Sequence, residues 1–428
     1  MPDIELLTIG TELLLGLTID TNSAELGRAL AGAGFGVVRR TSVTDVPAAI
    51  REAARAALER TGLVICTGGL GPTADDVTKR VIADLFGAQL EFQPALWQGL
   101  VDRFARYGRV PSEKNRSQAE VPHGATVLPN RWGTAPGLWL EGELVEASGA
   151  RGAAILLPGV PSEMRGLLHH EVLPRLASRA GKRVVRSRAV RTTGIPESRL
   201  AEQLGDIEGD LAPLSLAYLP GVSGVDLRLT AWGLPAAEAD QRLARGVRLL
   251  LERAGRWAYG EDDVDLAELV LAAARQRGLR VVVAESCTGG SIGARLTEIP
   301  GSSDVFLGGI IAYDNRVKVE QLGISPDMIE RHGAVSEAVA LAMAEGALRL
   351  MHADAAVAVT GIAGPDGGSL EKPVGLVIMG TVVDGIGEAH RHLFPGDRGE
   401  VRARAAQIAL SHLLQRLTAV PSDLSPPM

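Results

Sequence analysis

Short apolar runs alternate with longer stretches of helical spacing along the first part of the chain. The predicted strands are residues 4–9, 36–40, 63–66 and 154–157, and the predicted helices are 23–33, 46–60 and a segment from about residue 162. Pro47 is well placed in the first turn of the second helix. Alternation of this kind predicts an α/β domain with a doubly wound, mainly parallel sheet.

The pattern changes between about residues 180 and 260. In chain order, the elements are a strand at 184–191, a helix at 196–204, strands at 215–219 and 225–231, a helix at 236–253 and a strand at 257–260. This βαββαβ order predicts a small α+β domain of the split-βαβ type. The acidic residues Glu261, Asp262 and Asp263 are interpreted as a linker.

A second α/β pattern occupies the rest of the chain. It contains predicted helices at 264–276, 290–297, 337–350 and 399–417, and predicted strands at 281–283, 309–313, 355–360, 375–383 and 388–394. We therefore predict three domains, at residues 1–175, 180–260 and 262–418. The proline-containing end, residues 419–428, is expected to be a disordered tail.

Composition narrows the class of protein. With 46% hydrophobic and 22% charged residues, each predicted domain can bury a core. The net charge of −7 argues against a nucleic-acid footprint, which usually needs a basic excess. The two cysteines, Cys66 and Cys287, exclude a disulfide framework and fit a reducing compartment. No secretory signal and no long apolar span are recognised, so a cytoplasmic protein without membrane contact is expected.

Three loops of the N-terminal domain follow predicted parallel strands, at the edge where open α/β sheets bind ligands. The candidate residues of this site are Gly10, Glu12, Gly68, Gly69, Gly71, Thr73, Pro158 and Gly159. Glycines let the backbone approach a phosphate closely, and a following helix offers its N-terminus. Asp75 and Asp76 would repel a phosphate, which suggests that they bind Mg²⁺ or a similar divalent cation. The simpler alternative is that both aspartates only favour a helix N-terminus.

The loop from Thr67 to Asp76 closely resembles the molybdopterin-binding fold of molybdenum-cofactor biosynthesis proteins. The runs Asn115-Arg116-Ser117-Gln118 and Gly133-Thr134-Ala135-Pro136-Gly137 resemble the form of that domain in CinA proteins, over about residues 3–170. The resemblance adds Asn115 to the nucleotide site. It implies that this domain binds a nucleotide diphosphate. It also implies a metal-dependent ADP-ribose pyrophosphatase activity, separate from any activity of the C-terminal domain.

Ser286 lies where the strand at 281–283 gives way to a helix that begins near Gly290. Free backbone N–H groups at that helix N-terminus would stabilise negative charge, as a serine nucleophile requires. No histidine is placed by motif, and His332 is interpreted as a helix-terminus residue. Lys318 is the better candidate base, provided that burial or a neighbouring cation lowers its pKa. Tyr313 is a candidate proton relay or substrate ligand.

The spacing of five residues between Tyr313 and Lys318 would not place them on one helix face. Together with the absence of a Gly-x-Gly-x-x-Gly fingerprint in this segment, it argues against a short-chain dehydrogenase. The glycine-rich loop after Thr360 and the arginines that begin the last helix suit an anionic, nucleotide-sized ligand. The alternative for these arginines is that they lie on the surface of an ordinary helix capped by Asp397.

These motifs resemble the C-terminal domain of the CinA family, the nicotinamide mononucleotide (NMN) deamidases, over about residues 262–418. The resemblance rests on Glu285-Ser286-Cys287-Thr288-Gly289-Gly290, Tyr313, Lys318, the loop from Thr360 to Gly368 and Gly396-Asp397-Arg398. It implies hydrolysis of NMN to nicotinate mononucleotide and ammonia without a metal or other cofactor. Ser286 would be the nucleophile and Lys318 the base, with Tyr313 and Thr360 in support. The expected substrate-binding residues are Thr288, Gly289, Gly290, Gly361, Gly364, Arg398 and Arg402, the last on the phosphate.

The middle segment resembles the KH-like domain of full-length CinA proteins. Gly221-Val222-Ser223-Gly224 fits the Gly-x-x-Gly loop of KH modules, but its flanks lack basic residues, which favours an ordinary hairpin turn. Two alternatives remain open: a non-enzymatic competence or recombination adaptor, and a molybdopterin binder. A homodimer is the expected assembly.

Overall fold

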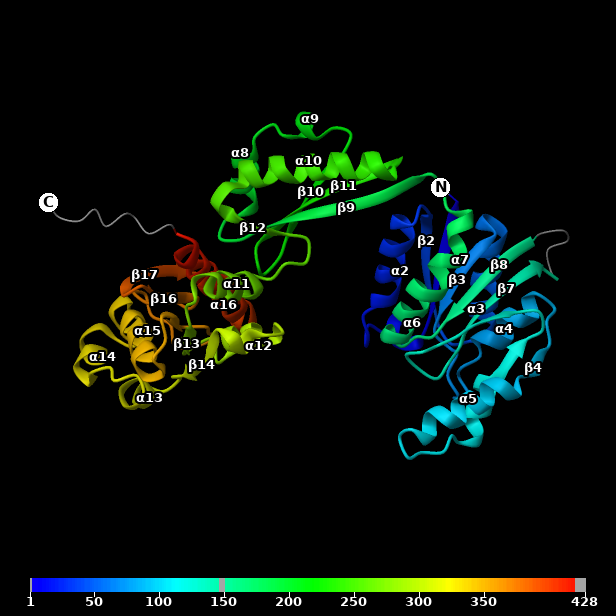
Figure 1. The fold of residues 1–428 in the computed structure, drawn as a ribbon, viewed down its shortest axis with the longest axis horizontal. Coiled ribbons are helices and arrows are strands. Elements are labelled where there is room, and N and C mark those ends of the chain that lie inside the picture. The colour runs from blue at the N-terminus through cyan, green and yellow to red at the C-terminus, as the bar shows by residue number, and fades with distance from the viewer. Residues whose placement is uncertain (1, 146–150, 420–428) are drawn as a thin grey trace. The chain divides into compact units, whose positions relative to one another are not determined.

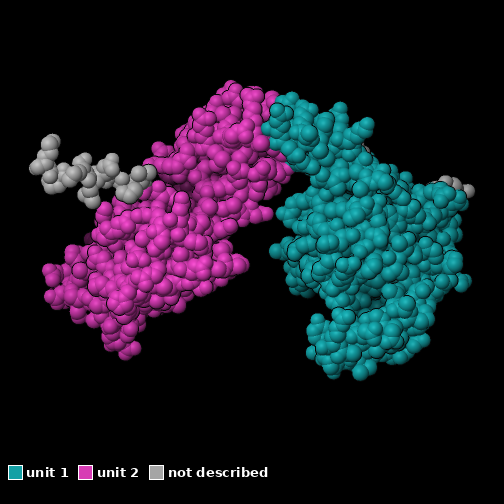
Figure 2. Space-filling model, viewed as in Figure 1, with its two compact units in different colours: residues 1–186, 231–242 teal, residues 187–230, 243–428 magenta. Residues whose placement is uncertain are grey.

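The computed structural model describes residues 2–145 and 151–419. The predicted tail lies outside the described residues except for Ala419. The chain divides into two compact units, residues 1–186 with 231–242 and residues 187–230 with 243–428 (Figure 2). Among the described residues, no helix combines the length and the apolar character needed to cross a membrane.

The N-terminal sheet has six strands in the order β2-β1-β3-β8-β7-β6 (Figure 1). Its strands are β1 (Asp3–Ile9), β2 (Gly36–Val43), β3 (Leu63–Thr67), β6 (Thr126–Leu128), β7 (Gly137–Glu143) and β8 (Arg151–Leu157). The first three and β8 are parallel, which confirms the predicted mainly parallel sheet. β6 and β7 run antiparallel at one edge, so the predicted alternation does not continue through that segment.

Successive side chains of each strand point to opposite sides of the sheet. Apolar side chains therefore lie on both faces, and helices cover both. One face is covered by α3 (Pro47–Thr61) and α4 (Thr78–Leu85), and the other by α2 (Thr21–Gly32) and α6 (Pro161–Leu167). On β1, Leu7 and Ile9 belong to the first of these cores, and Ile4 and Leu6 to the second. The remaining elements of this part are α1 (Thr11–Leu14), β4 (Leu90–Phe92), α5 (Pro94–Ala105), β5 (Glu120–Pro122) and α7 (Leu173–Leu176).

The middle segment forms a four-stranded sheet in the order β10-β11-β9-β12. Its elements are β9 (Arg183–Thr192), α8 (Glu197–Leu204), α9 (Glu208–Leu211), β10 (Ser215–Pro220), β11 (Val225–Pro235), α10 (Ala236–Ala254) and β12 (Ala258–Glu261). The predicted βαββαβ order is therefore confirmed, with the short α9 added. Gly246 of α10 approaches Leu229 of β11 so closely that an added Cβ would lie 2.7 Å from that side chain.

The C-terminal sheet has five strands in the order β14-β13-β15-β16-β17. They are β13 (Val281–Glu285), β14 (Phe306–Ile311), β15 (Ala355–Gly361), β16 (Leu376–Val383) and β17 (Ile386–Leu393). The first three are parallel and the last two antiparallel. The helices are α11 (Leu266–Arg277), α12 (Ser291–Glu298) and α16 (Arg398–Thr418) against one core, and α13 (Asn315–Glu320), α14 (Pro326–His332) and α15 (Glu337–Met351) against the other.

The register of this sheet determines where its loops lie. Glu285, the last residue of β13, pairs with Ile311 of β14 on one side and with Val359 of β15 on the other. The loops that follow these three parallel strands therefore leave the sheet at the same edge. That edge is where ligands bind in open α/β sheets.

Candidate functional site

Ser286 and Lys318 meet at the carboxyl edge of the C-terminal sheet. Ser286 directly follows β13, and Lys318 lies on α13, which begins soon after β14. Lys318 Nζ lies 3.3 Å from Ser286 Oγ, within hydrogen-bond range. β14 ends at Ile311, so Tyr313 stands two residues beyond it and not at the end of the predicted strand 309–313, whereas Lys318 lies on the next helix, α13.

The amine of Lys318 is buried, and the side chain is only 2% exposed. Nζ donates hydrogen bonds to the carbonyl oxygens of Ala312, at 2.8 Å, and Tyr313, at 3.2 Å. Burial lowers the pKa of Lys318 below its ordinary value, although the carboxylate of Asp314 opposes this change. A neutral amine that donates two N–H groups to these carbonyls keeps its lone pair for the hydroxyl proton of Ser286.

Besides Ser286, Cys287 is a second potentially nucleophilic side chain in this cavity. It is 5% exposed, and burial raises the pKa of its thiol to about 11. The thiolate is the reactive form of cysteine, so this thiol is almost entirely in its unreactive form at neutral pH. The geometry therefore favours the Ser286 hydroxyl as the nucleophile.

Glu285 occupies the N-terminus of α12, a role that the sequence did not indicate. Its carboxylate is 1% exposed and accepts hydrogen bonds from the backbone N–H groups of Gly290 (2.9 Å), Ile292 (3.2 Å) and Gly293 (2.9 Å). The expectation that these N–H groups are free to stabilise a reacting oxyanion is therefore wrong. The only sequence signal was a carboxylate placed five to eight residues before the groups that it binds.

Two other N–H groups of the serine loop remain available. Within the described residues, the backbone amides of Cys287 and Thr288 have no hydrogen-bond acceptor, and both residues are buried. They follow Ser286 directly, as oxyanion-hole donors often follow a nucleophile.

A cavity of about 270 Å³ opens beside Ser286 and Lys318. Its other lining residues are Cys287, Tyr313, Asn315, Ala334, Val335, Thr360, Gly361, Ile362, Ala363, Gly364, Asp366, Gly367 and Arg398. Asn315 and Asp366 were not among the predicted site residues. The hydroxyl of Thr360 donates to the carbonyl of Ala334 at 2.8 Å, which leaves its oxygen able to accept a further hydrogen bond.

Arg398 crosses the mouth of this cavity. Its guanidinium donates to the carbonyl of Gly364 at 2.6 Å and to the hydroxyl of Tyr313 at 2.9 Å. The Tyr313 side chain is 60% exposed, so this hydrogen bond orients a ring that is otherwise held by few contacts. Asp397 caps the same helix by accepting from the N–H of Glu400 at 2.9 Å. The last helix is thus both a capped helix and the source of a cation in the cavity.

The remaining predicted substrate ligands do not line this cavity. They are Thr288, Gly289, Gly290 and Arg402. Arg402 donates instead to the carbonyl of Thr288 at 2.9 Å, and thereby supports the serine loop.

A second cavity, of about 380 Å³, lies in the N-terminal domain beside the predicted glycine-rich loop. Gly69, Gly71 and Thr73 line it as expected, together with Lys79, Arg80 and Lys114. The latter three were not predicted, and they supply the positive charge that a phosphate needs. Burial lowers the pKa of Lys79 to about 8, and its amine donates to the carbonyl of Ser117.

The other predicted nucleotide-binding residues do not line the cavity. Gly10, Glu12, Gly68, Pro158 and Gly159 follow strands of the sheet, whereas Asn115 lies in a 3-10 helix at Glu113–Ala119. Gly68 and Gly159 are close neighbours, because an added Cβ on Gly159 would lie 3.5 Å from the Cα of Gly68. Asn115 forms a capping box with Ser112 and is therefore accounted for by local structure.

Asp76, one of the two predicted metal ligands, stabilises its own loop. Its Oδ2 accepts hydrogen bonds from the backbone N–H of Thr73 at 2.8 Å and from the Thr73 hydroxyl at 2.5 Å. Within residues 2–145 and 151–419, no group of three or more His, Cys, Asp and Glu side chains is placed to hold a metal. Asp76 lines the cavity, whereas Asp75 is exposed and does not, so a magnesium ion there would take one or two carboxylates and the phosphate oxygens of a substrate.

Comparison with known families assigns each part of the chain. The family described as "CinA C-terminal domain" matches residues 263–417 and "Damage-inducible protein CinA KH domain" matches 187–260. Residues 5–178 match the family described as "Probable molybdopterin binding domain".

Relatives with known names span nearly the whole chain. A CinA-like protein of Gemmatimonas aurantiaca is 50% identical over 414 residues, which are 96% of this chain and 95% of that protein. A CinA-like protein of Chlorobaculum tepidum is 40% identical over 418 residues, 96% of this chain and 98% of that protein. A solved structure of a competence/damage inducible protein from Agrobacterium tumefaciens is 43% identical and covers 36% of this chain and 97% of its own, with a TM-score of 0.35.

We expect Glu285→Gln to lower the free energy of unfolding by about 1–3 kcal/mol, because an amide cannot accept all three buried N–H groups. Urea unfolding of the full chain measures the loss of unfolding free energy. Hydrogen exchange at Gly290, Ile292 and Gly293 measures the loss of protection at the three N–H groups. Glu298→Gln, at the exposed end of the same helix, is the matched control. Equal stability of the two variants would contradict the role given to Glu285.

Proposed function

The chain belongs to the CinA family, and we propose that its C-terminal domain hydrolyses the carboxamide of NMN to nicotinate mononucleotide and ammonia. The observation that carries this proposal is the 3.3 Å contact between the buried amine of Lys318 and the hydroxyl of Ser286. A serine and a neutral lysine in contact form a nucleophile and a general base without a histidine.

In the proposed first step, Ser286 Oγ attacks the carboxamide carbon while its proton passes to the lone pair of Lys318 Nζ. A C–O bond forms, and the carbonyl oxygen becomes an oxyanion. The N–H group of Cys287 would stabilise that charge, since Cys287 lines the cavity and directly follows the nucleophile.

In the second step, the C–N bond breaks and Lys318 returns its proton to the leaving nitrogen, which departs as ammonia. Water then attacks the acyl ester on Ser286, with Lys318 again accepting a proton. The C–O bond to Ser286 breaks, the serine recovers its proton, and nicotinate mononucleotide leaves. The Lys318 amine thus acts as base and as acid in turn, which its lowered pKa favours.

Substrate binding is assigned to the groups that surround these two side chains. The free lone pair of Thr360 suits the carboxamide N–H of the substrate. Arg398, which crosses the cavity mouth, suits the phosphate, because a guanidinium binds phosphate oxygens in pairs. This proposal gives to Arg398 the contact that the family resemblance gave to Arg402.

For the N-terminal domain we propose binding of ADP-ribose and hydrolysis of its diphosphate. Support comes from the cavity in which Lys79, Arg80 and Lys114 face the glycine-rich loop. Asp75 and Asp76 would hold a divalent cation, which would neutralise charge on the diphosphate. Binding of molybdopterin is the second candidate, because the matching family is described by that ligand.

We expect Ser286→Ala to reduce ammonia release from NMN by at least about a thousandfold, since the nucleophile is lost. Coupled detection of ammonia with chromatography of the products measures the rate. Ser303→Ala, an exposed serine beyond the next helix, should keep the parental rate. Undiminished release from Ser286→Ala would remove Ser286 from the mechanism.

The pH dependence of NMN hydrolysis reports on Lys318. Only the neutral amine can accept the serine proton, so kcat/KM should rise with pH through the pKa of Lys318. Because burial lowers that pKa below the ordinary 10.5, the rise should be centred below 10.5. A profile that is flat, or that falls across this range, would contradict a neutral Lys318 as the base.

Lys79→Met is expected to weaken ADP-ribose binding about tenfold, the loss typical of one charge-assisted contact. In the parent protein, affinity should fall as pH rises through about 8, where Lys79 loses its proton. Calorimetry with ADP-ribose and with molybdopterin measures both ligands, and Lys182→Met, an exposed lysine, is the control. Binding of molybdopterin alone would contradict the ADP-ribose proposal.

A further inference from the structure

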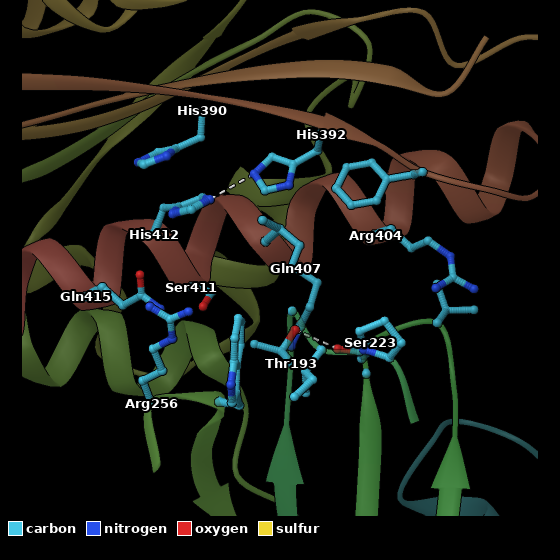
Figure 3. Close-up of a pocket in the computed structure, with 18 of the residues that line it drawn as sticks. Thr193, Ser223, Arg256, His390, His392, Arg404, Gln407, Ser411, His412 and Gln415 are labelled. Carbon is cyan, nitrogen blue, oxygen red and sulfur yellow. Dashed lines mark hydrogen bonds between the residues drawn. The ribbon is translucent and has the colours of Figure 1, made fainter. Parts of the chain in front are cut away.

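A larger cavity, of about 780 Å³, lies within the second unit and outside both sites described above (Figure 3). It is lined by β17, α16, two loops of the KH-like domain that contain Thr193 and Ser223, and the segment with Arg256 and Trp257. Its volume is in the range of cavities that bind small organic molecules. The elements around it belong to one compact unit, residues 187–230 with 243–428.

Flat rings from β17, α16 and the adjoining Phe394 line the cavity. His390 and His412 stack with centroids 4.1 Å apart and planes at 1°, and His392 stacks on Phe394 at 5.4 Å. His392 and His412 also share a hydrogen bond of 3.0 Å between their Nε2 atoms, so one ring donates and the other accepts (Figure 3). Burial lowers the pKa of His392 and lowers that of His412 to about 3, which leaves both rings neutral at physiological pH.

Trp257 adds an indole ring, fixed in place, to the lining of the cavity. Trp257 Nε1 donates to Gln203 Oε1 at 3.1 Å. The loop at Gly194 lies close to the ring, since an added Cβ there would be 3.3 Å from the indole. Several aromatic rings in one cavity favour a flat, stacking ligand.

The cavity also contains positive charge that no described carboxylate neutralises. Arg256 and Arg404 line it at opposite ends of the residues drawn (Figure 3), and neither forms an ion pair with any described residue. Arg404 Nε is buried and has no hydrogen-bond acceptor, whereas the nearby Arg416 is paired with Glu388. Arg256 contacts the face of Trp257, with its guanidinium carbon 4.4 Å from the ring centroid. A buried guanidinium N–H without an acceptor is costly, and a guanidinium without an ion-pair partner attracts an anion, so an anion is the expected complement of Arg404.

We propose that this cavity binds a phosphorylated nucleoside, with the base against the aromatic rings and the phosphate on Arg404. The base stacks on imidazole and indole faces, and the shared His392–His412 hydrogen bond leaves one Nδ1 atom as an acceptor and the other as a donor. The cavity is separate from the Ser286 site, so the proposal does not rest on the activity proposed there.

Histidine NMR of the full chain tests the proposal directly. Three of the eight histidines line the cavity, so ring signals of His390, His392 and His412 report on it without interference from nucleotides bound elsewhere. Titration with AMP should shift these three signals in a saturable way. Adenosine should shift the same signals but bind about tenfold more weakly, because it lacks the phosphate contact.

Arginine variants test the assigned phosphate contact. Arg404→Gln should weaken AMP binding about tenfold and leave adenosine binding nearly unchanged. Arg256→Gln, at the other end of the cavity, should affect AMP and adenosine binding alike, and Arg245→Gln, on the exposed face of α10, is the matched control. The proposal is overturned if the three signals do not move at millimolar AMP, or if Arg404→Gln binds AMP like the control. Tighter binding of a short single-stranded oligonucleotide than of AMP at the same signals would also overturn it, in favour of a nucleic-acid site.

Discussion

The contact between Lys318 and Ser286 depends on the burial of an amine that would ordinarily carry a positive charge. A lysine ammonium in water is a poor base, whereas an amine surrounded by protein loses the solvation that favours its charged form. Lys318 receives only carbonyl oxygens and the serine hydroxyl as hydrogen-bond partners, and no carboxylate contacts its amine among the described residues. The C-terminal sheet makes this possible, because the ends of β13 and β14 place Ser286 and the start of α13 at one edge.

Charge is arranged differently at the three cavities. In the C-terminal site, Glu285 is used to hold a helix N-terminus, and the cation that faces the cavity mouth comes from the first residue of α16. In the N-terminal site, lysine and arginine side chains gather opposite the glycine-rich loop. The histidine-lined cavity combines neutral rings with unpaired guanidinium groups. Each is suited to an anion, but only the first places a hydroxyl beside an amine.

Most strands could be predicted from the sequence, because buried parallel strands such as β13 contain continuous apolar runs. β4, β5, β6 and β7 were not predicted, since the first three are only three residues long and β7 is apolar on consecutive positions only in its first half. Ser286 and the glycine-rich loops were recognisable as motifs. Glu285 and Lys79 were missed because their roles depend on backbone groups that only the fold brings near. The histidine cluster was not predicted, because His390 and His392 lie on β17 whereas their partner His412 lies on α16, far along the chain in another element.

A double-mutant cycle of NMN hydrolysis on Ser286 and Lys318 tests the central claim most directly. If the two side chains act together as nucleophile and base, the variant that carries both Ser286→Ala and Lys318→Met should hydrolyse NMN no more slowly than the slower of the two single variants. If the two losses instead multiply, each residue contributes independently, and the pairing of Lys318 with Ser286 as base and nucleophile is contradicted.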